Sequence, residues 1–433
     1  MTPAARLSAA IEVLADIAAK RRPVAEALKD WGRSHRFAGS GDRAAISGIV
    51  YDTLRRRASA AGLMGSEEPR ALVLGMLKVM RGLDVEQIGQ LADGSRFAPA
   101  PLTKKERERL SGDALENAPP FAQGDYPQWL HASLRHVFGD DVIAEGEALA
   151  NRAPLDLRAN TLKATVEQAH AALSHLHPAP GRFSPLALRI TLDNEGKAPP
   201  VSAEPAFLKG EVEVQDEGSQ IVAIIARPLP GSQVLDLCAG AGGKTLELSA
   251  LMDNSGQIYA HDADIRRLKP LHERMTRAGV RNVQVRSPRG AEKVLEDLEG
   301  HMDLVLVDAP CTGTGTWRRN PDAKWRIRPG ALAQRTAEQA KILEDAVRYV
   351  RPGGRLAYIT CSLLDEENGE QIRALLSRHS DFSALPPSET ALALGEKGVE
   401  LAGAALLTRE GLLMTPRRTG TDGFFISVLQ RAG

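Results

Sequence analysis

Two cysteines and one aspartate are the residues of this sequence best suited to covalent chemistry. Cys311 lies in the motif Asp308–Gly315 and Cys361 in the motif Tyr358–Ser362, and each motif completes a short apolar run. A single buried cysteine usually behaves as a small core hydrophobe. Here both cysteines fall where consecutive strands would end, and neighbouring strands lie ~4.8 Å apart. Two thiols beside a carboxyl group suggest nucleophilic catalysis. A redox pair fits less well, because nothing else in the sequence implies electron transfer.

A glycine-rich turn forms a second candidate site. The run Asp236–Thr245 would end one strand and open a helix, whose free N–H groups attract anions. A P-loop needs glycine at position 238, which is cysteine, so a P-loop NTPase is excluded. A nucleoside-cofactor site instead predicts an acidic residue after the next strand, and Asp262 lies 19 residues past Gly243. Lys244 is unfavourable at a helix N-terminus unless it meets a bound carboxylate or is simply exposed.

A basic segment follows Cys311 directly. Residues 311–330 hold five Lys and Arg against one Asp, with Trp317 and Trp325 among them. Positive charge for phosphates and aromatic rings for bases are typical of proteins that bind single-stranded nucleic acid. An exposed basic loop without a partner is the plainer interpretation. The position beside the candidate nucleophiles favours nucleic acid.

From residue 231 onwards, the sequence predicts the sheet that must position these motifs. Apolar runs alternate with segments of helical periodicity, which indicates a doubly wound parallel α/β fold. In such folds ligands bind at the carboxyl ends of the strands. The expected strands are Val234–Cys238, Gln257–Asp262, Val283–Arg286, Met302–Asp308 and Arg355–Cys361, with two more near Gly411–Thr415 and Phe424–Leu429.

The chain before residue 231 shows a different organisation. Residues 1–110 have helical periodicity, and residues 1–60 hold 11 Lys and Arg against six Asp and Glu. That charge is as consistent with contact to RNA as with a solvated helical face. Residues 94–128 are rich in proline and glycine and are expected to form a linker. A helix at 129–150 and short strands within 155–214 then predict a small mixed α+β module.

Composition excludes several classes of protein. Lys and Arg balance Asp and Glu at 55 each, so a basic coat over the whole surface is excluded, although a local basic patch is not. Three widely spaced cysteines form neither a disulfide framework nor a zinc ribbon, and we expect no metal. Charges interrupt the N-terminal apolar stretch, and no apolar run reaches the ~18 residues that cross a membrane. We therefore expect a cytoplasmic protein without membrane contact.

The sequence resembles the RsmB/Nop2/Sun family of RNA cytosine-5 methyltransferases. Family members carry a Cys-x-x-x-Gly-Gly-Lys-Thr loop, an Asp-Ala-Pro-Cys-Ser-Gly-x-Gly loop followed by Arg-Arg-x-Pro-Asp-x-Lys-Trp, and a Thr-Cys-Ser. The corresponding segments here are Cys238–Thr245, Asp308–Gly315, Arg318–Trp325 and Thr360–Ser362. The front of the chain resembles the RNA-binding helical domain of antitermination factor NusB, best over Asp42–Arg57.

The resemblance implies a three-domain architecture. A helical NusB-like RNA-binding domain would cover residues 1–125, and a small α+β module, similar to an RNA-recognition domain, residues 126–212. A class I, Rossmann-like methyltransferase domain would cover residues 213–433, with strands one, four and five as neighbours. The cofactor would be S-adenosylmethionine. Its binding residues would be Cys238, Ala239, Gly240, Ala241, Gly242, Gly243, Lys244, Asp262 and Asp308, with Lys244 near the cofactor carboxylate.

The resemblance also implies roles for the catalytic residues. Chemistry alone does not choose between the thiols, but the Thr-Cys-Ser motif assigns the attack on carbon 6 of cytosine to Cys361. Cys311 would assist product release, and Asp308 would hydrogen-bond the base. Lys324 would help to position the target or Asp308. We expect a monomer that acts on ribosomal RNA, with transfer RNA as the alternative.

Two other functions remain to be weighed. Gly240–Gly243 replaces the usual Ala-Pro-Gly-Gly of the family, which favours a non-catalytic RNA-binding factor for ribosome assembly that retains the fold. The presence of both Cys311 and Cys361 argues against it. An amino-group methyltransferase would need an aromatic residue after the fourth strand, where this chain has Pro310 and Cys311.

Overall fold

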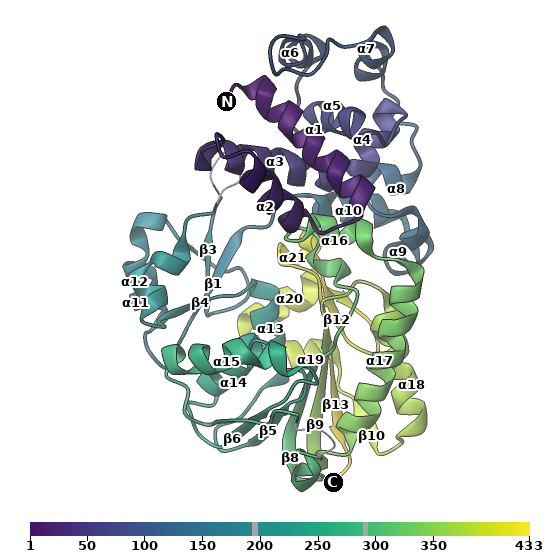
Figure 1. Cartoon of the computed structure of the whole chain (residues 1–433). Helices are drawn as coiled ribbons and strands as arrows, with labels where there is room; N and C mark the ends of the chain where they lie inside the picture. The colour runs from purple at the N-terminus through teal and green to yellow at the C-terminus, as the bar shows by residue number, and fades with distance from the viewer. Residues whose placement is uncertain (193–197, 289–292) are drawn as a thin grey trace. The chain divides into compact units, whose positions relative to one another are not determined.

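The computed structural model describes residues 1–192, 198–288 and 293–433 (Figure 1). These residues form two compact units. The first consists of Met1–Arg152 with Trp317–Ile327, and the second of Ala153–Thr316 with Arg328–Gly433. The limits of the units differ from those of the three expected domains, so the three-domain division stays a prediction. The central part of the basic segment after Cys311, Trp317–Ile327, belongs to the first unit.

The first unit is helical, as predicted for residues 1–110. Its core joins Ala10 and Val13 of the first helix to Ile46 and Val50 of the third and to Leu77 of the fifth. Its helices are α1 (Pro3–Lys20), α2 (Val24–Ser34), α3 (Ser40–Arg55), α4 (Arg57–Met64), α5 (Pro69–Val79), α6 (Val85–Leu91), α7 (Lys104–Ser111), α8 (Pro120–Gln123), α9 (His131–Phe138), α10 (Val142–Ala150) and α16 (Pro321–Arg326).

The prediction of a linker at residues 94–128 is wrong. A capping box of Thr103 and Glu106 opens α7, and Pro120 stands in the first turn of α8, where proline suits a helix. Leu110 and Tyr126 are fully buried. The prolines and glycines therefore separate short helices that belong to the first unit.

The second unit begins with a four-stranded antiparallel sheet of order β2-β3-β1-β4. Leu157 and Leu188 from this sheet pack against Ala169 and Leu173. This sheet agrees with the short strands predicted within 155–214, whereas the predicted helix at 129–150 forms α9 and α10 of the first unit. The elements are β1 (Leu155–Ala159), α11 (Val166–Ala172), β2 (Ala179–Pro180), β3 (Ala187–Ile190), α12 (Pro205–Leu208) and β4 (Val212–Val214).

A nine-stranded sheet forms the rest of the second unit. Its order is β11-β12-β13-β9-β8-β5-β6-β7, with β10 paired to β13. The run β9-β8-β5-β6-β7 is parallel, and β13 joins β9 antiparallel. The strands are β5 (Gln233–Asp236), β6 (Gln257–Ala260), β7 (Val283–Val285), β8 (Met302–Asp308), β9 (Val350–Thr360), β10 (Phe382–Ala384), β11 (Leu406–Leu407), β12 (Leu412–Met414) and β13 (Phe424–Arg431).

Helices cover both faces of this sheet, as the doubly wound prediction requires (Figure 1). Val305 and Ile359 are fully buried, because central parallel strands are covered on both sides. One face carries α13 (Glu217–Ala226), α14 (Gly243–Leu251) and α15 (Ile265–Ala278), and the other α17 (Pro329–Val347) and α18 (Gly369–Arg378). Three further helices near the C-terminus are α19 (Pro387–Ala391), α20 (Glu396–Ala404) and α21 (Pro416–Thr419).

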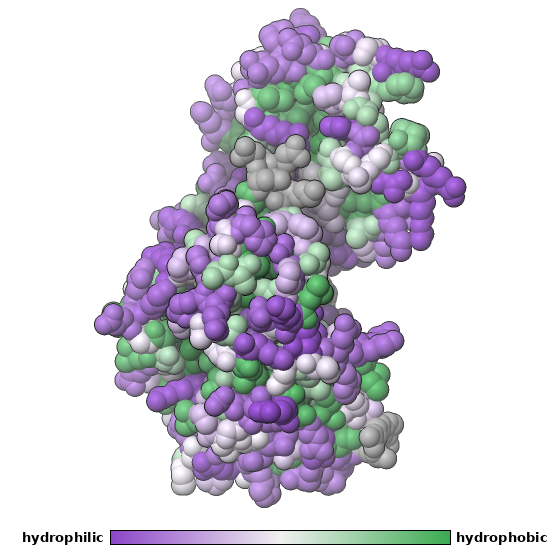
Figure 2. Space-filling model, turned by 90° about the vertical axis from the view of Figure 1, so that its left-hand side faces the viewer, coloured by the Kyte–Doolittle hydropathy of each residue, from purple (hydrophilic) through white to green (hydrophobic). Residues whose placement is uncertain are grey.

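Among the described residues, no helix combines the length and the apolar character that crossing a bilayer requires. On the face of the molecule that Figure 2 shows, hydrophilic residues predominate and apolar ones form small groups between them.

Candidate active site

The carboxyl ends of three neighbouring strands bring the candidate catalytic residues together. β8 lies between β5 and β9, in the order expected for strands one, four and five. Asp308 ends β8 opposite Ile359 of β9. Cys311 follows β8 by three residues, and Cys361 is the first residue after β9. Both cysteines therefore stand at the edge where open α/β sheets bind ligands.

The two thiols are in direct contact. The sulfur atoms of Cys311 and Cys361 lie 3.3 Å apart, and both residues are free cysteines with partly accessible side chains. The hydrogen bond to Cys361 raises the pKa of Cys311 well above its ordinary value, and burial contributes to this increase as the second cause. Cys311 therefore retains its proton and can donate it towards the sulfur of Cys361.

An ion pair connects the glycine-rich turn with the end of β8. The ammonium nitrogen of Lys244 lies 2.7 Å from a carboxylate oxygen of Asp308. Burial lowers the pKa of Lys244, but the charges of Asp308 and Cys361 and the hydrogen bond to Asp308 raise it above the ordinary value. Lys244 is therefore a buried cation that interacts with Asp308 and Cys361. The Asp308 side chain keeps 35% of its surface exposed, which leaves room for a further partner.

The turn between β5 and α14 has backbone features that a close ligand requires. The Ala239 N–H donates to the His261 carbonyl over 2.8 Å, and the Gly242 N–H donates to the Ala239 carbonyl over 2.9 Å. Gly242 has a φ of 85°, and a Cβ there would lie 2.2 Å from the Leu271 side chain. A Cβ on Gly243 would meet none of the described atoms within 4 Å. The backbone at Gly243 is therefore open.

Donors and acceptors suitable for a cofactor surround this turn. No described side chain caps α14, so its first N–H groups can bind an anion. Asp262 accepts from the Gly240 N–H over 3.0 Å and pairs with Arg267. One carboxylate oxygen of Asp236 is buried without a hydrogen-bond partner among the described residues, and burial raises the pKa of Asp236 to about 7. These groups fit a nucleoside ligand that also carries a carboxylate and an amino group.

The turn includes the third cysteine, Cys238. Its side chain is partly accessible, while burial and the nearby charge of Asp236 raise its pKa above the ordinary value. Cys238 therefore has the character of a neutral thiol in the wall of the cofactor region.

The sequence analysis missed a buried carboxylate that contacts both cysteine loops. Glu367 lies in the 3-10 turn η7 (Asp365–Glu367) and is fully buried. It accepts hydrogen bonds from Thr312, which follows Cys311, and from Ser362, which follows Cys361. The available signal was a hydroxyl residue directly after each cysteine, since such pairs need an acceptor when buried.

Lys324 belongs to the first unit and makes its hydrogen bonds there. Its ammonium donates to the carbonyl oxygens of Arg55 at 3.1 Å and Asp125 at 2.5 Å, within the first unit. The Trp325 indole N–H donates to the carbonyl of Leu54 over 2.6 Å, which fixes α16 on the end of α3. These contacts use Lys324 to hold helices together. A role of Lys324 in positioning the target or Asp308 stays a prediction. Within the second unit, Asp308 pairs with Lys244.

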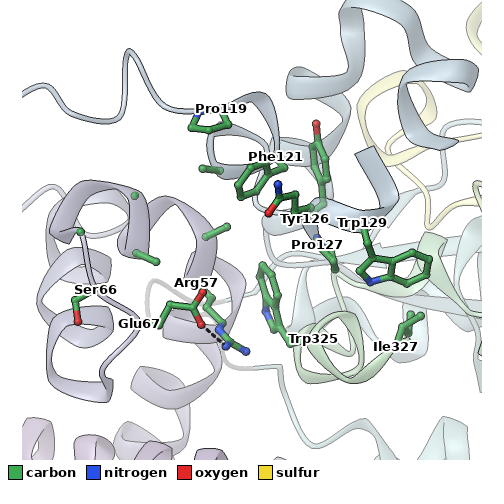
Figure 3. Close-up of a pocket in the computed structure, with 16 residues that line it drawn as sticks. Arg57, Ser66, Glu67, Pro119, Phe121, Tyr126, Pro127, Trp129, Trp325 and Ile327 are labelled. Carbon is green, nitrogen blue, oxygen red and sulfur yellow. Dashed lines mark hydrogen bonds and ion pairs between the residues drawn. The ribbon is translucent and has the colours of Figure 1, made fainter. Parts of the chain in front are cut away.

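The basic segment after Cys311 is folded rather than an open loop. Trp317 is 1% exposed. Trp325 and Ile327 instead line a pocket of about 700 Å³ in the first unit, and Figure 3 shows the Trp325 ring reaching into it from α16. Arg57 on the same wall lies 2.9 Å from Glu67. Contact between this segment and nucleic acid stays a prediction. The ring of Trp317 is too buried to stack on a base.

The parallel strand order, the glycine-rich turn after β5 and the acidic residue after β6 define a Rossmann-like nucleoside-binding fold, and similar solved structures are methyltransferases. A methyltransferase homolog from Pyrococcus horikoshii is 27% identical with a TM-score of 0.58, over 72% of this chain and 97% of that one. NSun6 from Pyrococcus horikoshii, solved with the S-adenosylmethionine analogue SFG, shares the fold at 21% identity and a TM-score of 0.60, over 71% of this chain and 98% of that one.

The particular family follows from the sequence comparisons. The model described as 16S rRNA methyltransferase RsmB/F matches residues 223–430, and the RsmF/B-like ferredoxin-like domain matches residues 126–194. A ribosomal RNA small subunit methyltransferase B from Xanthomonas campestris is 33% identical over 408 residues, which cover 90% of this chain and 89% of the relative. The chain belongs to the RsmB/Nop2/Sun family of S-adenosylmethionine-dependent methyltransferases.

Proposed function

We propose that this protein methylates carbon 5 of a cytosine in small-subunit ribosomal RNA. The names of its relatives support the RNA class. The observation that carries the cytosine-5 chemistry is the pair of sulfur atoms 3.3 Å apart, at the same edge of the sheet as the ion pair between buried Lys244 and partly exposed Asp308. Methyl transfer to an amino group needs no thiol, whereas carbon 5 of cytosine becomes nucleophilic only after a nucleophile adds to the ring.

The cofactor region fits S-adenosylmethionine, which supplies the methyl group when bound. Asp262 would accept hydrogen bonds from ribose hydroxyls, and the uncapped start of α14 would receive the carboxylate. The backbone of Cys238–Gly243 would line the site, with Asp236 able to accept from the amino group. Lys244 would act mainly through Asp308, because its ammonium already donates there.

In the proposed reaction the thiolate of Cys361 forms a bond to carbon 6 of cytosine. The electrons of the carbon 5–carbon 6 double bond then become available at carbon 5. Once carbon 5 carries the methyl group, it loses its proton to solvent. The electrons of that carbon–hydrogen bond re-form the carbon 5–carbon 6 double bond, the sulfur–carbon bond breaks and Cys361 leaves as thiolate. Cys311 assists this release, and Asp308 hydrogen-bonds the base through its exposed part.

The two sulfur atoms differ in their surroundings in a way that supports this division. Cys311 has a raised pKa because it bonds to Cys361, and the charge of Glu367 raises it further. The Lys244 cation interacts with the charge of Cys361. A cation near one sulfur and an anion near the other favour Cys361 as the nucleophile, because the thiolate is the reactive form.

The helical first unit would recognise the RNA. In this proposal, residues 1–125 form a NusB-like RNA-binding domain. Residues 126–212 form the small α+β module, and residues 213–433 form the methyltransferase domain. The positive charge within residues 1–60 supports it, since Lys and Arg neutralise phosphates. The expected protein acts as a monomer.

The test uses total RNA from a strain that lacks this gene. The purified protein is incubated with this RNA and radiolabelled S-adenosylmethionine, and the product is digested to nucleosides. Label in 5-methylcytidine, recovered from small-subunit ribosomal RNA, is the expected result. Label in transfer RNA would redirect the substrate, and label in another nucleoside would overturn the chemistry. Binding of RNA without transfer would favour the non-catalytic assembly factor.

A further inference from the structure

One carboxylate joins the two loops that carry the thiols. Glu367 accepts the Thr312 N–H at 2.8 Å and hydrogen bonds from the hydroxyls of Thr312 and Ser362. Gln339 donates to Glu367 over 3.0 Å and to the Pro310 carbonyl over 2.9 Å. The residues on both sides of Cys311 are therefore held, and four donors occupy the two oxygens. A carboxylate can accept about four hydrogen bonds, so Glu367 is saturated.

The neighbouring Asn368 secures the loop of Cys361 in the same way. Its amide donates to the Ser362 carbonyl at 2.9 Å, and its side-chain oxygen accepts from the Thr360 hydroxyl at 2.5 Å. The Gly315 N–H donates to the Cys361 carbonyl over 2.9 Å. Both loops are thus hydrogen-bonded to each other and to Glu367 at the end of η7, and the loop of Cys361 is also bonded to Asn368, which precedes α18.

We propose that Glu367 is a positioning residue for both thiols, which fixes the loop of Cys311 against the loop of Cys361 so that one sulfur faces the other. The proposal rests on the proposed cytosine-5 reaction for its effect on rate. Its geometric part concerns only the two loops. Glu367 touches neither sulfur through a hydrogen bond, so it acts through Thr312 and Ser362.

The charge of Glu367 adds a second effect. Hydrogen bonding to Cys361 and burial raise the pKa of Cys311, and the negative charge of Glu367 raises it further. Among the described residues, Cys361 and Tyr358, from β9 and its end, also interact electrostatically with Cys311. Glu367 thereby helps to keep the proton on Cys311, while the Lys244 cation interacts electrostatically with Cys361.

The first test compares Glu367→Gln with Glu370→Gln in the full-length protein. Glu370 is exposed three residues further on, so its variant controls for a lost negative charge at this end of the sheet. A glutamine cannot accept from both hydroxyls with its NH₂ group, so the loops would shift. We expect kcat to fall ~10- to 100-fold, because small misplacements of reacting groups have effects of that size. KM for RNA and for S-adenosylmethionine should stay within about threefold.

The second test reads the thiols without any methyl transfer. Iodoacetamide modification of Cys311 and Cys361 is followed separately by peptide mass spectrometry over a range of pH. In Glu367→Gln the loss of the negative charge lowers the pKa of Cys311, so its modification should be several-fold faster at a fixed pH. Glu370→Gln should match the unmodified protein. If the wild type methylates no cytosine, the proposed reaction fails while this labelling still decides the role of Glu367.

Two results would overturn the proposal. One is Glu367→Gln with wild-type kcat and an unchanged labelling profile. The other is a loss of kcat that only follows the unfolded fraction, with the labelling of folded protein unchanged. Should Glu367→Gln not fold, Thr312→Val removes one of the hydroxyls that donate to Glu367, and Thr312→Ser restores it. Thr312→Val should lose more kcat than Thr312→Ser, and equal rates for the two would count against Glu367.

Discussion

Each unit of this protein contains a buried charged residue that holds separate segments together by hydrogen bonds. The two residues differ in the groups that they bind. In the second unit Glu367 accepts from Thr312 and Ser362, which adjoin two partly accessible thiols. In the first unit Lys324 donates to main-chain carbonyls of Arg55 and Asp125 and is 1% exposed. The hydrogen bonds of Glu367 therefore hold residues next to the reactive thiols, whereas those of Lys324 join backbone carbonyls.

Two adjacent segments of the sequence therefore differ in what they do: one supplies a candidate catalytic residue, and the other stabilises the fold. The segment Asp308–Gly315 belongs to the second unit and supplies Cys311, whereas Trp317–Ile327 belongs to the first. Burial lowers the pKa of Lys324 to about 7, although the charge of Asp125 opposes this effect. A lysine sealed in this way serves stability better than recognition, and the following predictions test that contrast.

The largest effect is expected from Cys361→Ala. Removing the proposed nucleophile should reduce methyl transfer by at least ~10³-fold, because the bond to carbon 6 that activates carbon 5 would no longer form with Cys361. The radiolabel assay measures the loss, and circular dichroism shows whether the variant is folded. Substantial activity in folded Cys361→Ala would contradict the assignment.

Lys324→Met should affect folding instead. The variant leaves the buried carbonyls of Arg55 and Asp125 without the ammonium that donates to them, which should cost about 2–6 kcal/mol of stability. Denaturant unfolding measures the change, with the exposed Lys105→Met as the matched control. The kcat of the folded variant should remain within about twofold of wild type. A normal unfolding midpoint with a strongly reduced kcat would show that Lys324 belongs to the reaction after all.

Asp308→Asn should give a smaller effect on the chemical cluster. The substitution keeps the shape but removes the charge that pairs with Lys244, and it weakens the proposed contact to the base. We expect kcat to fall ~100-fold, at the low end for a group that assists proton transfer. Steady-state kinetics with both substrates measure it. A change confined to KM for S-adenosylmethionine would assign Asp308 to the cofactor alone.

The sequence predicted the part of the site that depends on strand ends. Apolar runs placed Cys311 and Cys361 after β8 and β9, and adjacent parallel strands bring their ends together. Glu367 escaped prediction because its partners come from separate segments that meet only in the folded sheet. The resemblance assigned Lys324 a role by motif, but the packing of α16 on α3 decides where its ammonium points. The linker prediction failed because proline also opens short helices.

The smallest predicted effect concerns pH and Asp236. Burial raises its pKa from an ordinary 3.8 to about 7, so the folded state binds this proton more tightly than the unfolded state does. Its contribution to stability is complete below about pH 4 and is lost as the pH rises to about 7. Asp236→Asn removes this titration, so its melting temperature should decline less than that of the wild type across this range. Parallel declines would contradict the raised pKa.

The most direct test of the account traps the covalent intermediate. RNA that carries 5-fluorocytidine cannot lose a proton from carbon 5, so the enzyme should remain attached once S-adenosylmethionine is present. Peptide mass spectrometry then identifies the linked residue. The account predicts a bond to Cys361, both in the wild type and in Cys311→Ala. A bond to Cys311, or methyl transfer to natural RNA with no adduct on the fluorinated RNA, would contradict it.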